Sequence, residues 1–161
     1  MATNDIRTRL EGLTDFAVPS LQGMQPMQMW RSGVIRDATP HHDQVGISFG
    51  ITGGPAVVAD DKLNFYWCNL DGGAPELVDA VLPTTEGRTT DVLVMSDVKD
   101  ICDLVFSVRF DRVLQPLEGS FIVYSPGDAW QLIIEHEKGI GDLALTGQIV
   151  RYRFGTPQIQ P

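Results

Sequence analysis

The feature that most constrains this chain is a hydrophobic period of two residues. Between Leu104 and Phe110 every second side chain is apolar, whereas Ser107 and Arg109 occupy alternate positions. A β-strand with one buried face and one solvated face requires this alternation. The pattern therefore predicts a strand here, and it predicts further short strands at 27–35, 45–51, 56–59, 63–70, 91–95, 120–124, 129–137 and 143–154.

Turn-forming clusters of Gly, Pro, Ser and Asp separate these strands, for example at 52–55 and 125–128. Eight or nine short strands with turns at this spacing are typical of an all-β antiparallel sandwich, jelly roll or barrel. No stretch alternates a strand with a long helix, so a parallel α/β sheet is disfavoured. Two segments break the β pattern, and 75–82 and 96–103 are predicted to form short helical turns.

The two ends of the chain resemble arms attached to one β domain at 27–154. The N-terminal part, 1–26, is predicted to contain a short helix at 3–13, because apolar residues recur there at helical spacing. Its second half is rich in proline and apolar residues, which suit docking on the fold or on a neighbouring subunit better than free solution. The C-terminal tail, 155–161, is expected to be extended.

The last predicted strand changes its buried face partway along. Leu143 and Leu145 are apolar on one parity, Val150 and Tyr152 are apolar on the other, and Gly147 lies between them. A glycine at such a switch predicts a β-bulge or a crossing between two sheets.

Charge and composition exclude several classes of function. The 161 residues carry a net charge of −9, which disfavours nucleic-acid binding by a basic surface. No apolar run is long enough to span a membrane. The N-terminus lacks the apolar core of a secretory signal, so the expected location is the cytoplasm, or a virion or other assembly released on lysis.

Two cysteines, Cys68 and Cys102, lie in strongly apolar surroundings. A disulfide scaffold of this size would normally contain more cysteines at closer spacing. Two buried free thiols are therefore the expected state, with a single bridge as the alternative.

The most ligand-like cluster is His41, His42 and Asp43, with Asp37 nearby. Imidazoles and a carboxylate are ligands for transition metals. Adjacent residues on a strand point to opposite faces, however, so the two histidines can share a metal only within a loop. A solvated loop is the simpler interpretation, and no metal or cofactor is expected.

Weak catalytic candidates lie near the end of the strand at 129–137. By alternation, His136 shares the apolar face of this strand, whereas Glu135 faces the other way. A histidine at the rim of an apolar barrel is a candidate general base, and Tyr124 is a candidate hydroxyl donor. The simpler interpretation is a histidine half in solvent at a strand end.

Large aromatic residues are candidates for a ligand-binding surface: Trp30, Tyr66, Trp67 and Trp130. Such residues on short strands more often belong to the core. The run at 65–67 places aromatic side chains on both faces of one strand. One face is expected to be core and the other to be covered by an arm, a helix or a partner.

Three functional hypotheses follow from these observations. The first is a non-enzymatic assembly or binding module that self-associates as a homo-oligomer through its arms and apolar strand faces, as a virion structural or decoration component would. The second is a small β-barrel isomerase, cyclase or lyase with an apolar small molecule in the barrel. The third is a lectin-like or toxin-like protein that recognises a glycan or lipid.

Overall fold

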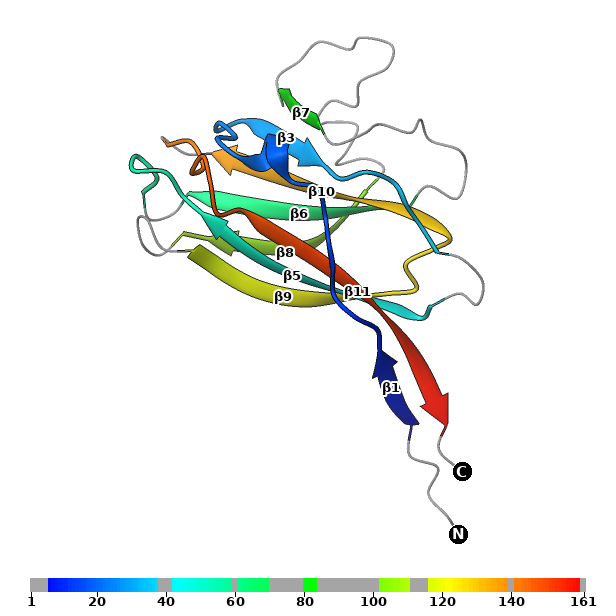
Figure 1. Ribbon diagram of the computed structural model, residues 1–161. Helices are drawn as coiled ribbons and strands as arrows, with labels where there is room; N and C mark the ends of the chain where they lie inside the picture. Colours follow the sequence, from blue (N-terminus) through cyan, green and yellow to red (C-terminus); the bar gives the residue numbers. More distant parts are fainter. Residues whose placement is uncertain are drawn as a thin grey trace, which may run out of the picture.

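The computed structural model describes residues 6–37, 42–58, 61–69, 80–83, 102–110, 116–138 and 141–159. These residues form two antiparallel sheets stacked as a sandwich (Figure 1). The five-stranded sheet has the order β1-β11-β5-β9, with β2 also paired to β11. Its strands are β1 (Ile6–Leu10), β2 (Thr14–Asp15), β5 (Gln44–Thr52), β9 (Pro116–Tyr124) and β11 (Ile149–Ile159).

The six-stranded sheet has the order β7-β3-β10-β6-β8, with β4 also paired to β10. Its strands are β3 (Gln28–Arg31), β4 (Ile35–Arg36), β6 (Lys62–Asn69), β7 (Ala80–Pro83), β8 (Asp103–Arg109) and β10 (Ala129–Lys138). Across the described residues the two sheets keep separate outer strands and do not close into a barrel. The predicted all-β antiparallel fold is confirmed, and among its variants the sandwich is the one observed.

Alternating side chains build the core between the sheets. In β5 every second residue, from Val45 to Ile51, is buried, and the residues between them face outward. The β10 side chains of Trp130, Leu132 and Ile134 meet them from the opposite sheet within one hydrophobic cluster. This arrangement is what the period of two predicts for strands with one buried face.

The predicted helix at 3–13 is wrong, because residues 6–10 form β1. Ile6, Thr8 and Leu10 also fit a period of two, and β1 pairs with β11 from Leu10 opposite Gly155 to Ile6 opposite Ile159. Pairing with a partner strand thus outweighed a short helical pattern that had no face to bury. The two strands continue beyond the body of the sandwich as a ribbon that leads to both chain ends (Figure 1).

The segment after β1 docks on its own domain. The Phe16 amide donates to the Val150 carbonyl at 2.9 Å, and Phe16, Leu21 and Met24 are buried in the core cluster. A single 3-10 turn, η1 (Pro19–Leu21), shapes this stretch. Of the two predicted docking sites for the second half of the N-terminal part, the fold or a neighbouring subunit, the structure shows the fold.

Three other predicted elements are wrong where the structure describes them: the helical turns at 75–82 and 96–103, and the strand at 56–59. Residues 80–83 are strand β7, paired with β3, so the helix expected over 75–82 is wrong at its C-terminal end. Asp103 begins strand β8 and is not part of a helical turn. Residues 55–58 form a turn and a loop, not the expected strand. The remaining parts of these segments, at 75–79 and 96–101, and the strand expected at 91–95 lie outside the described residues.

A β-bulge corrects the face predicted for one residue. Phe65 pairs with Phe106, but the next residue, Tyr66, pairs with Leu104, so Val105 is the extra residue on β8. Val105 and Phe106 therefore both pack against the core, and Leu104 is exposed. Strict alternation had placed Leu104 on the buried face.

Gly147 has φ of 84°, in the left-handed region that favours glycine. Before it, Leu143 makes an isolated bridge to Gly53. After it, β11 begins at Ile149. The positive φ fits a special role for this glycine, but the predicted bulge or crossing within a strand over 143–154 is wrong, because the paired strand starts only at Ile149 and its register with β5 is unbroken.

Candidate functional site

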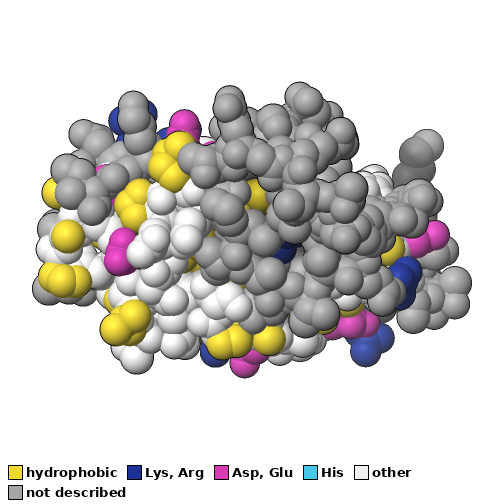
Figure 2. Space-filling model, turned by 90° about the horizontal axis from the view of Figure 1, so that it is seen from above, with side chains coloured by type: hydrophobic (Ala, Val, Ile, Leu, Met, Phe, Trp, Pro, Cys, Tyr) yellow, Lys and Arg dark blue, Asp and Glu magenta, His cyan; other side chains and the backbone are white. Residues whose placement is uncertain are grey.

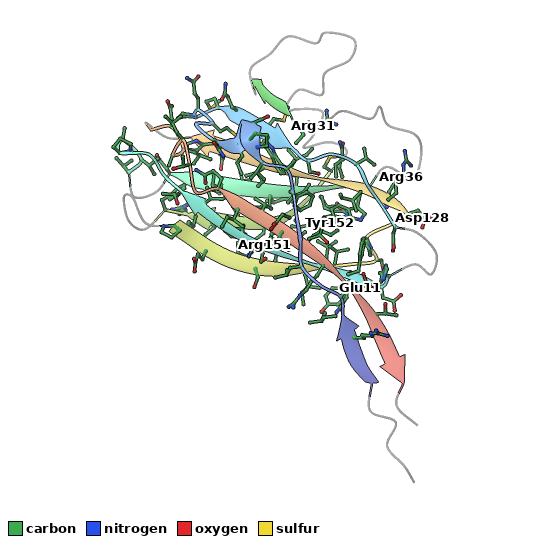
Figure 3. All side chains as sticks on the ribbon, viewed as in Figure 1. Glu11, Arg31, Arg36, Asp128, Arg151 and Tyr152 are labelled. Atoms are coloured by element: carbon green, nitrogen blue, oxygen red, sulfur yellow. A yellow bond between two sulfur atoms is a disulfide. The ribbon has the colours of Figure 1, made fainter. Side chains whose placement is uncertain are left out.

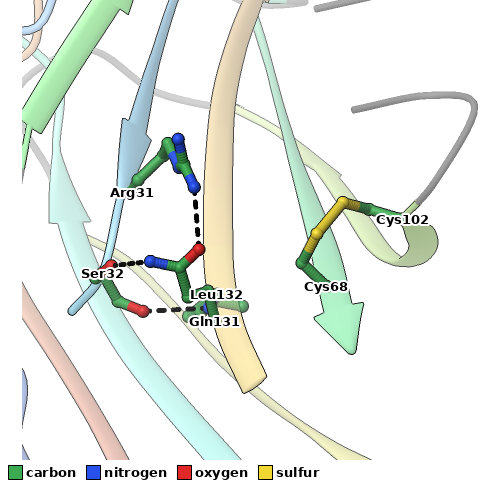
Figure 4. Close-up of a disulfide and its surroundings, with 6 residues drawn as sticks. All are labelled: Arg31, Ser32, Cys68, Cys102, Gln131 and Leu132. Atoms are coloured by element: carbon green, nitrogen blue, oxygen red, sulfur yellow. Dashed lines mark hydrogen bonds between the residues drawn. A yellow bond between two sulfur atoms is a disulfide. The ribbon is translucent and has the colours of Figure 1, made fainter. Parts of the chain in front are cut away.

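The two cysteines form a disulfide, with Cα atoms 4.5 Å apart (Figure 4). The expectation of two free thiols is wrong, and the alternative of a single bridge is correct. The cause is topological, because Trp67 of β6 pairs with Asp103 of β8 and this pairing brings Cys68 beside Cys102. Sequence spacing alone does not reveal which strands become neighbours.

The three tryptophans lie in the core and not on an accessible surface. Trp30 and Trp130 are completely buried, and Trp67 is nearly so. Trp67 and Trp130 stack with ring centroids 4.1 Å apart, and Phe16 contacts Trp30 and Trp130 edge-on. The structure gives these side chains the role of packing the two sheets together.

His136 and Glu135 lie on opposite faces of β10, as alternation predicted. The expectation that His136 is half in solvent is wrong, because its exposed fraction is 0%. The main chain of Met24 faces the ring, but neither ring nitrogen reaches full hydrogen-bond geometry with a partner among the described residues. Burial lowers the pKa of His136, and the nearby carboxylates of Asp61 and Asp142 offset this only in part.

Tyr124 does not join these residues. It lies at the end of β9 in the other sheet, on the outer face, with an exposed fraction of 70%. The three catalytic candidates therefore occupy three different environments: the buried interior, the covered outer face of the six-stranded sheet, and the exposed outer face of the five-stranded sheet.

A buried polar network lies on the outer face of the six-stranded sheet. Glu135 accepts hydrogen bonds from Asn64 Nδ2 at 2.8 Å and from the Tyr66 hydroxyl at 3.0 Å. Burial and the charge of Glu135 raise the pKa of Tyr66, so this hydroxyl remains a donor. Asn64 also donates to Glu137, which Lys62 contacts at 2.8 Å. Alternation places each residue on this face, but only the β6–β10 register brings them together.

Arg31 is completely buried on the same face (Figures 3 and 4). Its Nη2 donates to Gln131 Oε1 at 2.8 Å, and the Gln131 amide donates to the Ser32 carbonyl. Within the described part of the chain, Nε and Nη1 of Arg31 have no hydrogen-bond partner. Burial lowers the pKa of this guanidinium. Alternation along 28–31 is enough to place Arg31 on the outer face. It gives no indication that this face is buried.

The apolar part of this face is also buried. Met29, Tyr66, Ala129 and Ile133 form a second hydrophobic cluster with the two cysteines. The prediction that both faces of the strand at 65–67 are covered is confirmed, because Phe65 and Trp67 lie in the core and Tyr66 is buried outside it.

The candidate metal cluster is not assembled. His42 Nδ1 lies 2.6 Å from Asp37 Oδ1, its Nε2 lies 3.2 Å from Glu11 Oε1, and its ring stacks on Phe154. Both nitrogens are thus engaged by carboxylates, and Asp43 is exposed to solvent. His41 lies outside the described residues, and among those described there is no group of three or more His, Cys, Asp or Glu suited to a metal ion.

His42 therefore acts as a clamp. Partial burial lowers the pKa of His42, but its hydrogen bonds to Asp37 and Glu11 raise it by more, so that it lies above the ordinary value. The ring joins the loop after β4 to Glu11, which follows β1 directly at the base of the ribbon. The clamp lies where the ribbon leaves the sandwich.

The outer face of the five-stranded sheet is open. Its central strand, β5, presents small residues there, because Gly46, Ser48 and Gly50 face outward between the buried positions. Longer side chains of β9 and β11 rise on either side and enclose two adjoining hollows of about 290 Å³ and 370 Å³. The sequence shows the small residues at 46, 48 and 50. Whether they line a hollow depends on which strands flank β5, and the sequence does not reveal this.

Apolar residues on the described surface are exposed at separate places. The large ones are Leu10, Leu13, Met27, Val58, Leu104, Ile122, Tyr124, Leu145 and Ile149. Seen from above, the described hydrophobic side chains form separate patches around the margin of the molecule (Figure 2). Among the exposed apolar residues named above, Ile122 and Tyr124 lie on the same outer strand, β9.

The strands of the ribbon are basic within an acidic protein. β1 and β11 contain Arg7, Arg9, Arg151 and Arg153, which are four of the 12 basic residues. All 21 acidic residues of the chain lie outside these two strands. Arg151 forms an ion pair with Asp15.

The sequence matches no protein-family model and no curated protein. Among the described residues, no helix has the length and apolar character needed to cross a lipid bilayer.

Proposed function

We propose that this protein is a non-enzymatic all-β module that associates with copies of itself, as a structural or decoration component of a virion-like assembly does. The observation that carries the proposal is the ribbon of β1 and the end of β11, which extends beyond the sandwich (Figure 1). A projecting ribbon that buries little surface on its own domain is suited to contact a neighbour.

Electrostatics favours a second copy as that neighbour. The ribbon, in which β1 pairs with β11 from Gly155 onward, carries Arg7 and Arg9 and no carboxylate, and the rest of the chain carries every acidic residue. A basic projection on one molecule and an acidic body on the next attract each other and steer the encounter. Contacts between two different surfaces of identical molecules generate rings or open filaments.

The interior of the fold gives no matching support to an enzyme that binds its substrate between the sheets. The described space there is filled by interlocking aromatic side chains, including Phe49, Phe65 and Phe106. The hollows described above lie on the outer face of the five-stranded sheet. No single observation favours a glycan or lipid over a second copy of the chain.

The test is the solution mass of the full chain by light scattering, over a range of concentrations and at about 0.05 M and 0.5 M salt. We expect a multimer of the 17.7 kDa chain that weakens at high salt, because screening reduces the attraction between ribbon and body. Replacing Arg7→Glu and Arg9→Glu together is expected to reduce the mass, whereas Arg7→Lys with Arg9→Lys preserves it. A monomer under all conditions overturns the proposal.

A further inference from the structure

We infer that β9 is a second contact between copies, in which two β9 strands pair edge to edge and antiparallel about a twofold axis. The two five-stranded sheets then join into one continuous sheet. This inference rests on the proposed function and names one surface that the assembly uses.

The first argument is the regularity of β9 as an outer strand. All nine residues, Pro116 to Tyr124, are in register with β5 without interruption, and β9 pairs with no other described strand. Its outer edge therefore presents a row of main-chain donors and acceptors. Proteins normally protect such an edge with bulges, charges or short strands, because it will accept another strand.

The other outer strands show that protection. β8 has a bulge and carries Asp103 and Arg109. β7 has only four residues, and β1 carries Arg7 and Arg9 within five residues. β9 is longer than any of these and contains a single charged residue, Glu118. Among the described outer strands, β9 is thus the best suited to accept another strand.

The second argument concerns exposed side chains. On the outer face of β9, the exposed fractions are 52% for Ile122 and 70% for Tyr124. Large apolar side chains gathered on one unprotected edge mark an interaction surface more often than isolated ones do. A partner strand beside β9 would cover both side chains.

The third argument is charge. Two molecules with a net charge of −9 repel each other, so they meet most easily where the surface is least acidic. The charged residues on the described outer face of this sheet are Asp15, Glu118, Arg151 and Arg153, whose formal charges cancel. This outer face is therefore a neutral region of an acidic molecule, and β9 forms its margin.

The pattern of β9 is compatible with its own copy. The antiparallel register that pairs all nine residues places Ser120 on the twofold axis, with Glu118 of one copy opposite Ile122 of the other. The two Glu118 residues are then offset by four positions, or roughly 13 Å along the strands. This separation exceeds the screening length of about 8 Å at physiological salt, so the like charges repel weakly.

The first experiment compares Ile122→Lys with Ile149→Lys in the full chain. Both residues are exposed on the same outer face, but Ile122 is on the edge strand and Ile149 is on the interior strand β11. A lysine on the edge opposes strand addition. We expect Ile122→Lys to weaken association at least tenfold by light scattering, with little effect from Ile149→Lys. Equal effects of the two variants would overturn the inference.

The second experiment locates the axis. Glu118→Cys, Ser120→Cys and Ile122→Cys are oxidised singly, and the control is Ser48→Cys on β5, next to Ser120 but inside the sheet. The native cysteines are already bonded to each other. We expect at least one β9 variant, with Ser120→Cys first, to form a covalent dimer on a non-reducing gel, and the control to stay monomeric.

The outcomes separate the two claims. A multimer that persists in Ile122→Lys, with no covalent dimer from any β9 cysteine, refutes pairing through β9 and leaves the proposed function standing. A wild-type chain that is monomeric at all concentrations refutes both.

Discussion

The outer faces of the two sheets differ more than any other two regions of this molecule. On the six-stranded sheet, outward residues such as Met29, Arg31 and Ile133 are completely buried. On the five-stranded sheet, outward residues such as Ile122 and Tyr124 are mostly exposed. Both sheets share the same core, so the difference does not arise from packing between them.

The contrast shows which half of the sandwich exposes its outer side chains. The six-stranded sheet has a second hydrophobic cluster, a buried polar network and the disulfide on its outer side. These features belong to the interior of the folded chain. The five-stranded sheet keeps a neutral outer face, an unprotected edge and the ribbon, and these are the features on which the proposed self-association depends.

The largest expected effect comes from removing the disulfide beside the covered face. Cys68 and Cys102 are separated by 34 positions, and closing a loop of this size stabilises a protein by about 4 kcal/mol in the chain-entropy model. Cys68→Ala with Cys102→Ala is expected to lower the melting temperature by about 10 °C, as measured by calorimetry. Reducing the wild-type protein should produce a similar decrease. An unchanged melting temperature would show that the disulfide does not stabilise the covered outer face of the six-stranded sheet.

The second prediction compares one isoleucine from each outer face. Ile133→Ala removes a completely buried side chain and is expected to cost about 3 kcal/mol of unfolding free energy. Ile122→Ala removes a half-exposed one and is expected to change stability by less than about 0.5 kcal/mol. Urea unfolding at a concentration too low for association measures both. A similar loss of unfolding free energy in the two variants would contradict the difference in burial between the two outer faces.

The sequence predicted the faces of single strands better than the relations between strands. Alternation correctly separated His136 from Glu135, and the parity switch drew attention to Gly147, whose φ is positive, because both are properties of one stretch of chain. The disulfide and the Glu135–Tyr66 bond depend on which strands are neighbours and in which register. The bulge that turns Leu104 outward is a pairing effect of the same kind. Pairing is a long-range property, and local periodicity carries no signal for it.

The third prediction uses the buried histidine of the six-stranded sheet. The pKa of His136 is lowered in the folded protein, so below about pH 6.5 the unfolded chain binds more protons than the folded chain. Stability from this residue is complete above that pH and decreases as the pH falls, by at most about 1.4 kcal/mol per pH unit. Asp61, Asp142 and the main chain of Met24 face the ring and limit the effect.

His136→Leu is expected to flatten the decrease in melting temperature between pH 7.5 and 5, although it changes the packing at every pH. The slope against pH, and not the absolute melting temperature, is therefore the relevant readout. A variant whose slope equals that of the wild type would show that His136 does not titrate in this range.

The smallest expected effect comes from His42, the histidine that packs against the five-stranded sheet. Its pKa is raised by Asp37 and Glu11, so the folded chain binds more protons than the unfolded chain at pH values above the ordinary pKa of about 6.5. The stabilisation is complete below that value and is lost as the pH rises through the raised pKa. The sign is thus opposite to that of His136.

His42→Gln can keep a hydrogen bond to Asp37 but cannot carry the charge. We expect it to remove a small, salt-sensitive gain in stability at pH 6 and to have less effect at pH 8.5, as measured by urea unfolding. Glu11→Gln is the matched test, because Glu11 is the exposed partner of the clamp and lies at the base of the ribbon. If the clamp positions the ribbon, both variants also weaken association more at pH 6 than at pH 8.5. A loss of stability without any loss of association would separate the clamp from the contact surface.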